Sequence, residues 1–353
     1  MERNDSLKTG GGSDPAAGFS SGQGTSVERL AGGREFDLIR RFYAGQPLSP
    51  RADVRLGAGD DCAVVAGDGI VLSLDLSVEG VHFRRDWLKP FEIGYRATTA
   101  SLSDLAAMAA RPIGVLVSVA AHENDADDFA VELMRGVTAA VSAVGGVLLG
   151  GDLTRSLGPL VVDVVSVGEA SSPITRSGAL PGDEVWVTGQ LGGSGAAVEK
   201  MLAGEAPEVS ALERFRAPAA RVAEARWLAE TGCLTAMLDL SDGLGGDAGH
   251  LASASGVSVH IESKLLPIHA AARASGSMGN ALRLALSGGE DYEICLTART
   301  GCLQNHVDAF QDRFGIPLTR VGRVEAGEGA FLLDDNSQRR PLAGGFQHFR
   351  AEQ

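Results

Sequence analysis

The chain alternates short apolar runs typical of β-strands with longer segments of helical periodicity, and this alternation most restricts its possible folds. It predicts an α/β architecture with some α+β character. Strands are predicted over residues 62–66, 70–76, 114–121, 147–149, 161–167, 184–188, 236–240, 257–261, 292–297 and 318–324. Helices are predicted over residues 35–43, 92–110, 128–144, 196–202, 219–230, 244–253 and 303–314.

The domain organisation follows from length and from helix-breaking residues. A chain of 353 residues is too long for one ordinary core and predicts two domains. Residues 1–26 contain six Gly and five Ser, so a disordered tail is expected over residues 1–30. The N-terminal domain is expected over residues 31–170 and the C-terminal domain over 171–353. Arg111-Pro112 is predicted to end the first long helix and Gly145-Gly146 the second.

Composition excludes several classes of function. The formal net charge of −14 argues against nucleic-acid binding, which depends on Lys and Arg contacts to phosphates. We find no apolar run of 18 residues and no signal-peptide pattern, so no membrane association is expected. The four cysteines show neither zinc spacing nor a disulfide framework, which favours a reducing cytoplasm.

Seven aspartates lie in short motifs rich in Gly or Ser, several of them directly after an apolar run. Gathering such carboxylates is costly, since two of them about 4 Å apart repel by roughly 4 kcal/mol at an effective dielectric near 20. A site that collects them must therefore bind cations, and oxygen ligands favour Mg²⁺ over zinc. The seven residues are Asp60, Asp61, Asp75, Asp104, Asp152, Asp239 and Asp242.

Each motif alone has a structural alternative. Asp and Gly dominate ordinary turns. Asp75 could pair with Arg84 or Arg85, and Asp104 could cap a restarted helix. The Gly-rich stretch 187–195 could cradle a phosphate, but a structural turn is the favoured interpretation. The stretch 287–293, SGGEDYE, could contact a cationic ligand or form a solvated turn.

Taken together and in order, the motifs resemble the thiamine-monophosphate kinase family of the aminoimidazole-ribonucleotide-synthetase-like superfamily. The resemblance rests on GAGDDCAVV, LDLSVEGVHF, SLSDLAAMAARP, GGDLTRS, ITRSGALPGDEVWVTG, LDLSDGL and LSGGEDYE, and extends from about residue 35 to 349. It implies an enzyme that phosphorylates thiamine monophosphate to thiamine diphosphate with ATP and several Mg²⁺ ions. It also implies a homodimer formed by N-terminal domains that bind ATP and Mg²⁺, with the C-terminal domain completing the active site.

The resemblance also assigns roles to residues. Asp104 and Asp242 would be the most critical, with no acid or base catalyst required. Metal ligands would be Asp61, Ser73, Leu74, Asp75, Asp104, Asp152, Asp239 and Asp242. Nucleotide contacts would come from Asp61, Gly151, Asp152, Arg176 and Ser241, and the thiamine end from His82, Glu290 and Phe346.

Two positions depart from the family pattern. Leu74 stands where relatives often carry Thr, so its ligand would have to be the backbone carbonyl. Phe346 stands where Tyr or Trp is frequent, which keeps a ring face for the cationic thiazolium but loses the polar atom.

Three rival functions remain open at this stage. Synthases of the same superfamily activate an oxygen with ATP, and a selenophosphate synthetase is a poorer match because no Cys lies in a Gly-rich loop near the start. A non-catalytic protein that binds divalent cations is the alternative of another class. The absence of any contiguous EF-hand loop argues against it.

Overall fold

The computed structural model describes residue 41 and residues 54–56, 64–65, 69–125, 127–334, 336 and 338–342. The predicted tail, most of the helix expected over 35–43, and Asp60, Asp61 and Phe346 lie outside the described residues. Of the strand expected over 62–66, the structure describes β2 (Val64–Val65), which pairs antiparallel with β1 (Val54–Leu56).

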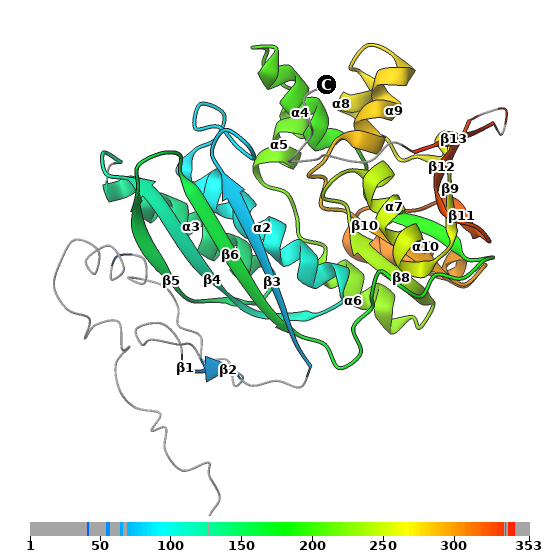
Figure 1. Cartoon of the computed structure of the whole chain (residues 1–353), viewed down its shortest axis with the longest axis horizontal. Coiled ribbons are helices and arrows are strands. Elements are labelled where there is room, and N and C mark those ends of the chain that lie inside the picture. The colour runs from blue at the N-terminus through cyan, green and yellow to red at the C-terminus, as the bar shows by residue number, and fades with distance from the viewer. Residues whose placement is uncertain are drawn as a thin grey trace, which may run out of the picture.

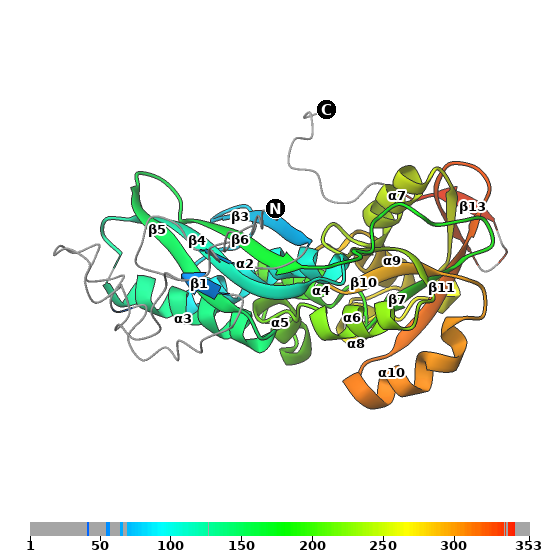
Figure 2. The ribbon, with the colours of Figure 1, turned by 90° about the horizontal axis from the view of Figure 1, so that it is seen from below.

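The N-terminal domain consists of a four-stranded sheet with two helices on one face (Figures 1 and 2). The strand order is β3-β6-β4-β5, in which only β4 and β5 are parallel. The elements are β3 (Ile70–Val78), α2 (Pro90–Ala107), β4 (Arg111–His122), α3 (Asp127–Ala143), β5 (Val147–Ser156) and β6 (Val161–Glu169).

Two glycines let α2 and α3 pack closely. A Cβ on Gly94 of α2 would lie 2.0 Å from the Leu133 carbonyl oxygen, and one on Gly136 of α3 would lie 1.9 Å from that of Phe91. Any side chain there would therefore push the helices apart. The close approach holds α2 against the sheet, where Leu102 and Leu105 are fully buried.

The other face of this sheet carries an apolar stripe on β3. Side chains alternate along the strand, so Ile70, Leu72, Leu74 and Leu76 share the face opposite α2. Leu72 is 65% exposed and Leu74 is 62% exposed. We call these four residues the β3 stripe.

The C-terminal domain is built on a seven-stranded sheet of order β13-β12-β9-β11-β7-β10-β8 (Figure 1). Only the β12–β9 pair is parallel. The strands are β7 (Glu184–Thr188), β8 (Leu234–Asp239), β9 (Ser258–Glu262), β10 (Ile294–Ala298), β11 (Leu318–Glu325), β12 (Gly329–Leu333) and β13 (Arg339–Pro341). The helices are α4 (Gly193–Leu202), α5 (Val209–Arg216), α6 (Val222–Glu230), α7 (Leu244–Ser255), η2 (Ser263–Leu265), α8 (Ala270–Arg273), α9 (Met278–Ser287), η3 (Leu303–His306) and α10 (Val307–Phe314).

The α/β class is confirmed, and most predicted elements of the described region occur within a few residues of their expected bounds. The elements that were not predicted are α5, α8, α9, η2, β1, β12 and β13. The predicted end of the first long helix was wrong, because α2 ends at Ala107 and Pro112 lies inside β4. The chain turns earlier, at Ala109, which takes a left-handed φ of 53°.

Asp75 lies within a strand, as the prediction over residues 70–76 has it, whereas Asp152 was expected beyond the strand over residues 147–149 and lies within a strand as well. Asp75 lies inside β3, and β5 continues past residue 149 to Ser156, so it includes Asp152. Both are tolerated because these strands form the two edges of the sheet and expose part of their side chains.

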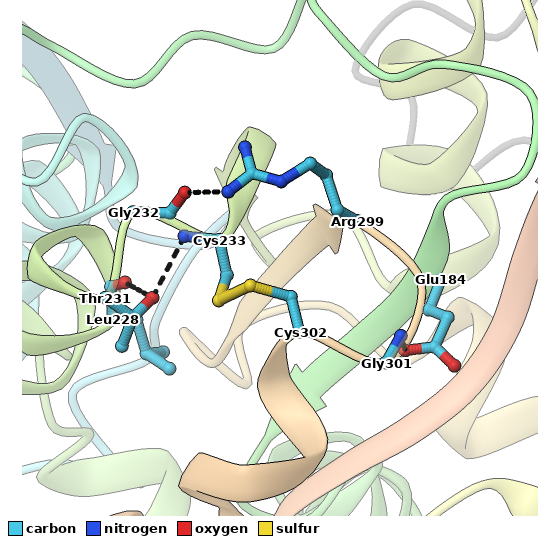
Figure 3. The surroundings of a disulfide bond; sticks show 8 residues. All are labelled: Glu184, Leu228, Thr231, Gly232, Cys233, Arg299, Gly301 and Cys302. Atoms are coloured by element: carbon cyan, nitrogen blue, oxygen red, sulfur yellow. Dashed lines mark hydrogen bonds between the residues drawn. A yellow bond between two sulfur atoms is a disulfide. The ribbon is translucent and has the colours of Figure 1, made fainter.

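A disulfide joins Cys233, at the start of β8, to Cys302, before η3 (Figure 3). Reduced thiols were expected from the sequence, and this expectation was wrong for Cys233 and Cys302, because two cysteines 69 residues apart form no local motif. Nearby, Arg299 donates to the Gly232 carbonyl at 2.6 Å, which ties the same two segments together. Cys295 is a buried free thiol. In the part of the chain that is described, no helix is long and apolar enough to cross a membrane.

Candidate active site

Five aspartates from both domains form one electrostatically coupled group, which we call the acidic cluster. Asp75 comes from β3 and Asp104 from α2, whereas the other three follow one another in the C-terminal domain. Asp239 ends β8, Asp242 lies in the next turn and Asp247 in the first turn of α7. The members are Asp75, Asp104, Asp239, Asp242 and Asp247.

Serines of the N-terminal domain orient two of these carboxylates. Ser73, two residues before Asp75 on the same face of β3, donates its hydroxyl to Asp104. Ser103 on α2 donates to Asp239 at 2.7 Å and so crosses between the domains. Asp104 lies in the last turn of the continuous helix α2, so the alternative of a cap for a restarted helix was wrong.

Burial is the largest cause that raises the pKa values of Asp75, Asp104, Asp239 and Asp247. Burial, and then repulsion from Asp104 and Glu290, raises the pKa of Asp75 to about 6. Burial and Asp104 raise the pKa of Asp239 to about 7, and burial with Asp239 and Asp242 raises that of Asp247 to about 8. The ionised forms of these acids are therefore costly, and either protons or bound cations must compensate them.

Arg176 is a cation close enough to act on this group. Its positive charge lowers the pKa values of Asp104, Asp239 and Asp247, although burial outweighs it in each case. Its side chain is exposed. An exposed guanidinium beside a group of buried carboxylates can meet an anion held between them.

Sequence reasoning missed part of the cluster. Single oxygen or nitrogen atoms of Asp242, Asp247 and His250 lie within 4.8 Å of one another, an arrangement that could hold a metal ion. The Asp247 carboxylate also accepts the backbone N–H of Asp242 at 3.2 Å. The missed signal was the spacing in LSDGLGGDAGH, which places Asp247 and His250 three residues apart on one face of α7.

The three acids of SGGEDYE each have their own set of partners. Glu290 forms an ion pair with the buried Arg96 of α2. Asp291 accepts the backbone N–H groups of Gly192 at 2.6 Å and Ser194 at 3.4 Å. The stretch is therefore not a solvated turn. The Gly-rich stretch 187–195 was interpreted as a structural turn and not a phosphate cradle. This is confirmed for these two amides, because the Asp291 carboxylate already accepts their hydrogen bonds.

Glu293, the third acid, is fully buried in a basic setting. It accepts from Arg221 at 2.6 and 2.7 Å, from Arg214 at 3.1 Å and from Thr188 at 2.8 Å. A Cβ on Gly189 would lie 2.1 Å from its carboxylate oxygen. The arrangement ties α5, α6 and β7 to the start of β10.

Asp152 does not join the acidic cluster within one chain. In the sheet register, Asp152 pairs with Ser118 of β4. Ser118 also pairs with Asp163 of β6, and Asp163 pairs with Leu76 of β3. Residues paired across a sheet share a face, so Asp152 lies on the side of the β3 stripe, away from Asp75. Its carboxylate accepts the backbone N–H of Leu153 at 2.9 Å.

The remaining predicted residues occupy varied positions. Gly151 allows β5 to approach β4, since a Cβ would lie 2.0 Å from the Val117 carbonyl oxygen. The Leu74 side chain belongs to the β3 stripe, and the Ser241 carbonyl accepts the Glu290 N–H at 2.7 Å. His82 follows β3 and accepts the Val78 N–H at 3.0 Å.

Arg84 and Arg85 do not pair with Asp75, which removes that structural alternative. Arg84 donates to Asp86, and Arg85 donates to Glu79 and Asp125. The charges that act on Asp75 are instead those of Asp104, Glu290 and Asp163, which raise its pKa, and that of Arg96, which lowers it.

Both domains match family models. The model described as AIR synthase related protein, N-terminal domain, matches residues 59–170, and the corresponding C-terminal domain model matches residues 181–335. These matches and the fold define the class as the two-domain AIR synthase related proteins.

Whole-chain comparisons narrow the class further. The chain is 32% identical over 324 residues to the thiamine-monophosphate kinase of Salmonella typhimurium, which covers 89% of this chain and 98% of that protein. The crystal structure of thiamine-monophosphate kinase from Stenotrophomonas maltophilia K279a matches with a TM-score of 0.75 at 32% identity, covering 86% and 96% of the two chains. A structure of AaThiL complexed with AMPPCP and TMP matches with a TM-score of 0.69 at 30% identity, covering 79% and 87%. The chain belongs to the thiamine-monophosphate kinase family.

Proposed function

We propose that this protein transfers the γ-phosphoryl group of ATP to the phosphate of thiamine monophosphate and so forms thiamine diphosphate. The observation that carries the proposal is the acidic cluster, in which carboxylates of both domains converge. A relative in the family was solved with AMPPCP and TMP, which supports a site for a nucleotide and a phosphate ester.

The acidic cluster fits Mg²⁺. Its donor set consists of carboxylate and hydroxyl oxygens with one imidazole nearby, and oxygen ligands are those that Mg²⁺ prefers. Asp75, Asp104, Asp239 and Asp242 would hold the ions in the described region, together with the predicted ligand Asp61. When bound, Mg²⁺ supplies positive charge that offsets the repulsion between two anionic substrates.

The chain itself then has to orient the two phosphates. Arg176 would contact the nucleotide phosphates from the C-terminal domain, because its charge already acts on three acids of the cluster. Ser73 and Ser103 would keep the Asp104 and Asp239 carboxylates in place. The acceptor phosphate has a second pKa near 6, so it is mostly ionised at neutral pH and no general base is needed.

We infer direct transfer, because no nucleophilic side chain is required. Transfer from ATP with a chiral γ-phosphoryl group should invert the configuration at phosphorus. Retention would require a phosphoenzyme and would contradict this mechanism.

His82, Glu290 and Phe346 would bind the thiamine end. Glu290 can place a negative charge near the cationic thiazolium, since it contributes to the electrostatics of Asp75 and so lies close to the acidic cluster. Substituting Phe346 with Ala should raise KM for thiamine monophosphate without raising that for ATP. Equal effects on both substrates would remove Phe346 from this role.

The assay is ADP release coupled to detection of thiamine diphosphate. Purified protein is given ATP, Mg²⁺ and one acceptor: thiamine monophosphate, formylglycinamidine ribonucleotide or selenide. Turnover only with thiamine monophosphate supports the proposal, and turnover with another acceptor supports the matching rival function. Metal binding without turnover would support the non-catalytic alternative.

We further propose a homodimer with the β3 stripe at its interface. An apolar row this exposed on a sheet edge is a typical contact surface. Asp152 lies on the same face and would meet the second copy. Leu74→Asp should lower the molar mass measured by light scattering to that of one chain, whereas Leu202→Asp, a substitution of an exposed leucine elsewhere, should not.

The homodimer offers a role for Asp152 across the interface. If Asp152 acts on the partner's site, mixing inactive Asp104→Asn and Asp152→Asn proteins should restore turnover. Full activity of Asp152→Asn alone would show that this carboxylate is not a ligand.

The cytoplasmic location predicted from the sequence is also kept as a proposal. The Cys233–Cys302 disulfide bears against it, since disulfides are uncommon in reducing compartments. Cell fractionation combined with alkylation of free thiols would test both points.

A further inference from the structure

Arg96 is a buried arginine that the proposed reaction does not use. It lies on α2 of the N-terminal domain, and its hydrogen bond, ring contact and ion pair reach residues of the C-terminal domain. It donates to the Phe215 carbonyl at 2.6 Å, its guanidinium lies 4.1 Å from the centre of the Phe215 ring, and it forms an ion pair with Glu290 without hydrogen-bond geometry. Burying a guanidinium is costly unless its partners are well placed, so these contacts belong to a defined arrangement.

The Glu290 backbone is held from the other side. Its N–H donates to the Ser241 carbonyl at 2.7 Å, and the Tyr292 N–H donates to the Leu240 carbonyl at 2.9 Å. Glu290 and Tyr292 take left-handed φ values of 67° and 49°, which side chains rarely adopt. The backbone of residues 290–292 is thereby tied to the turn between Asp239 and Asp242, while the Glu290 side chain is held by Arg96 of α2.

The same face of α2 contacts the acidic cluster. Ser103 lies seven residues after Arg96, about two turns or 10.5 Å along the helix, and donates to Asp239. One rigid helix therefore contacts both the cluster and Glu290. Without Arg96, the Glu290 carboxylate would face repulsion from Asp75, on whose pKa it already acts.

We propose that Arg96 is a positioning residue that holds Glu290 at a set place beside the acidic cluster and so determines affinity for the cationic end of the acceptor. This role rests on the proposed function. Arg96 touches neither substrate in this scheme and acts through Glu290.

The test compares Arg96→Met, Arg96→Lys and Glu290→Gln with the control Arg216→Met. Arg216 also joins α5 to α2, through Glu92 at 3.6 Å, but no contact with Glu290 is seen for it. Steady-state kinetics are measured separately for thiamine monophosphate and ATP. Arg96→Met and Glu290→Gln should each raise KM for thiamine monophosphate at least about tenfold, with KM for ATP and kcat changed less than about twofold.

Arg96→Lys should recover part of the loss, because it keeps the charge but not the planar fork. The double variant of Arg96→Met and Glu290→Gln should be no worse than either single variant. The control should stay within about twofold of wild type for both substrates.

Several results would overturn the role. An equal rise in both KM values, a fall in kcat alone, or additive effects in the double variant would show that Arg96 acts only on the fold. If Arg96→Met does not fold, Arg96→Lys and Glu290→Gln still decide the matter. Wild-type protein that makes no thiamine diphosphate would refute the proposed function itself, whereas active wild type with unaltered variants refutes only the role of Arg96.

Discussion

Glu293→Gln should destabilise the protein strongly, although the change replaces a single atom. Glu293 is 0% exposed and accepts hydrogen bonds from two arginines and a threonine. The amide of Gln cannot offset the positive charges of Arg221 and Arg214. One of them is deeply buried, since the Arg221 side chain is 7% exposed.

The expected loss of unfolding free energy follows from the arginine charge that the substitution leaves buried without full compensation. Removing one partner of a buried ion pair costs about 3–5 kcal/mol, because the other charge stays buried without compensation. Two features reduce that cost here. Glu224 remains a partner of Arg221 at 3.1 Å, and the Gln carbonyl can still accept a hydrogen bond. The expected loss of unfolding free energy is therefore about 3 kcal/mol, the lower end of that range.

Stability is measured by urea denaturation monitored with far-UV circular dichroism. The dependence of free energy on urea concentration is compared between variants, so that a shift in midpoint reports a change in stability. The matched control is Glu169→Gln, which removes the partner of Arg111 in a half-exposed ion pair, with side chains 25% and 35% exposed. The control should lose about 1 kcal/mol or less. A loss below about 1 kcal/mol for Glu293→Gln would refute the view that Glu293 compensates a buried charge.

Three further predictions concern the acidic cluster and the disulfide. Asp104→Asn should leave the fold intact and lower turnover at least about tenfold, roughly 1.4 kcal/mol of barrier, and near-normal turnover would remove Asp104 from the site. Cys302→Ser should lower the unfolding free energy by about 4 kcal/mol, from the loop entropy of a 69-residue separation. If wild type denatures identically with and without dithiothreitol, the disulfide to Cys233 does not form. Burial and Asp104 raise the pKa of Asp239 to about 7 from 3.8, so between these values the folded state holds more protons than the unfolded state. The unfolding free energy of the metal-free protein should therefore fall as pH rises from about 5 to about 8. Mg²⁺ should stabilise the protein more at the higher pH, where more of the carboxylates are ionised. An unfolding free energy that rises over this interval would contradict the raised pKa of Asp239.

The sequence alone contained much of the architecture and the chemical character of the site. Alternating apolar runs and helical periodicity are local properties, and they predicted the α/β class and most described elements. Aspartates next to apolar runs predicted a cation-binding group, and Asp75, Asp104, Asp239 and Asp242 do belong to one acidic cluster. Such a pattern predicts a cation site from the sequence alone, because buried carboxylates that repel one another need a compensating positive charge.

Which side chains face one another depends on strand register and helix packing, which no local pattern encodes. Asp152 shows this, because its place in β5 puts it on the face opposite Asp75 although both follow the same sequence pattern. Arg96 and Glu290 are 194 residues apart in the sequence numbering, and Cys233 and Cys302 are 69 apart, yet each pair is in contact. Only the folded chain brings such distant segments together, since their contacts arise from the packing of whole helices and strands and not from the residues beside them.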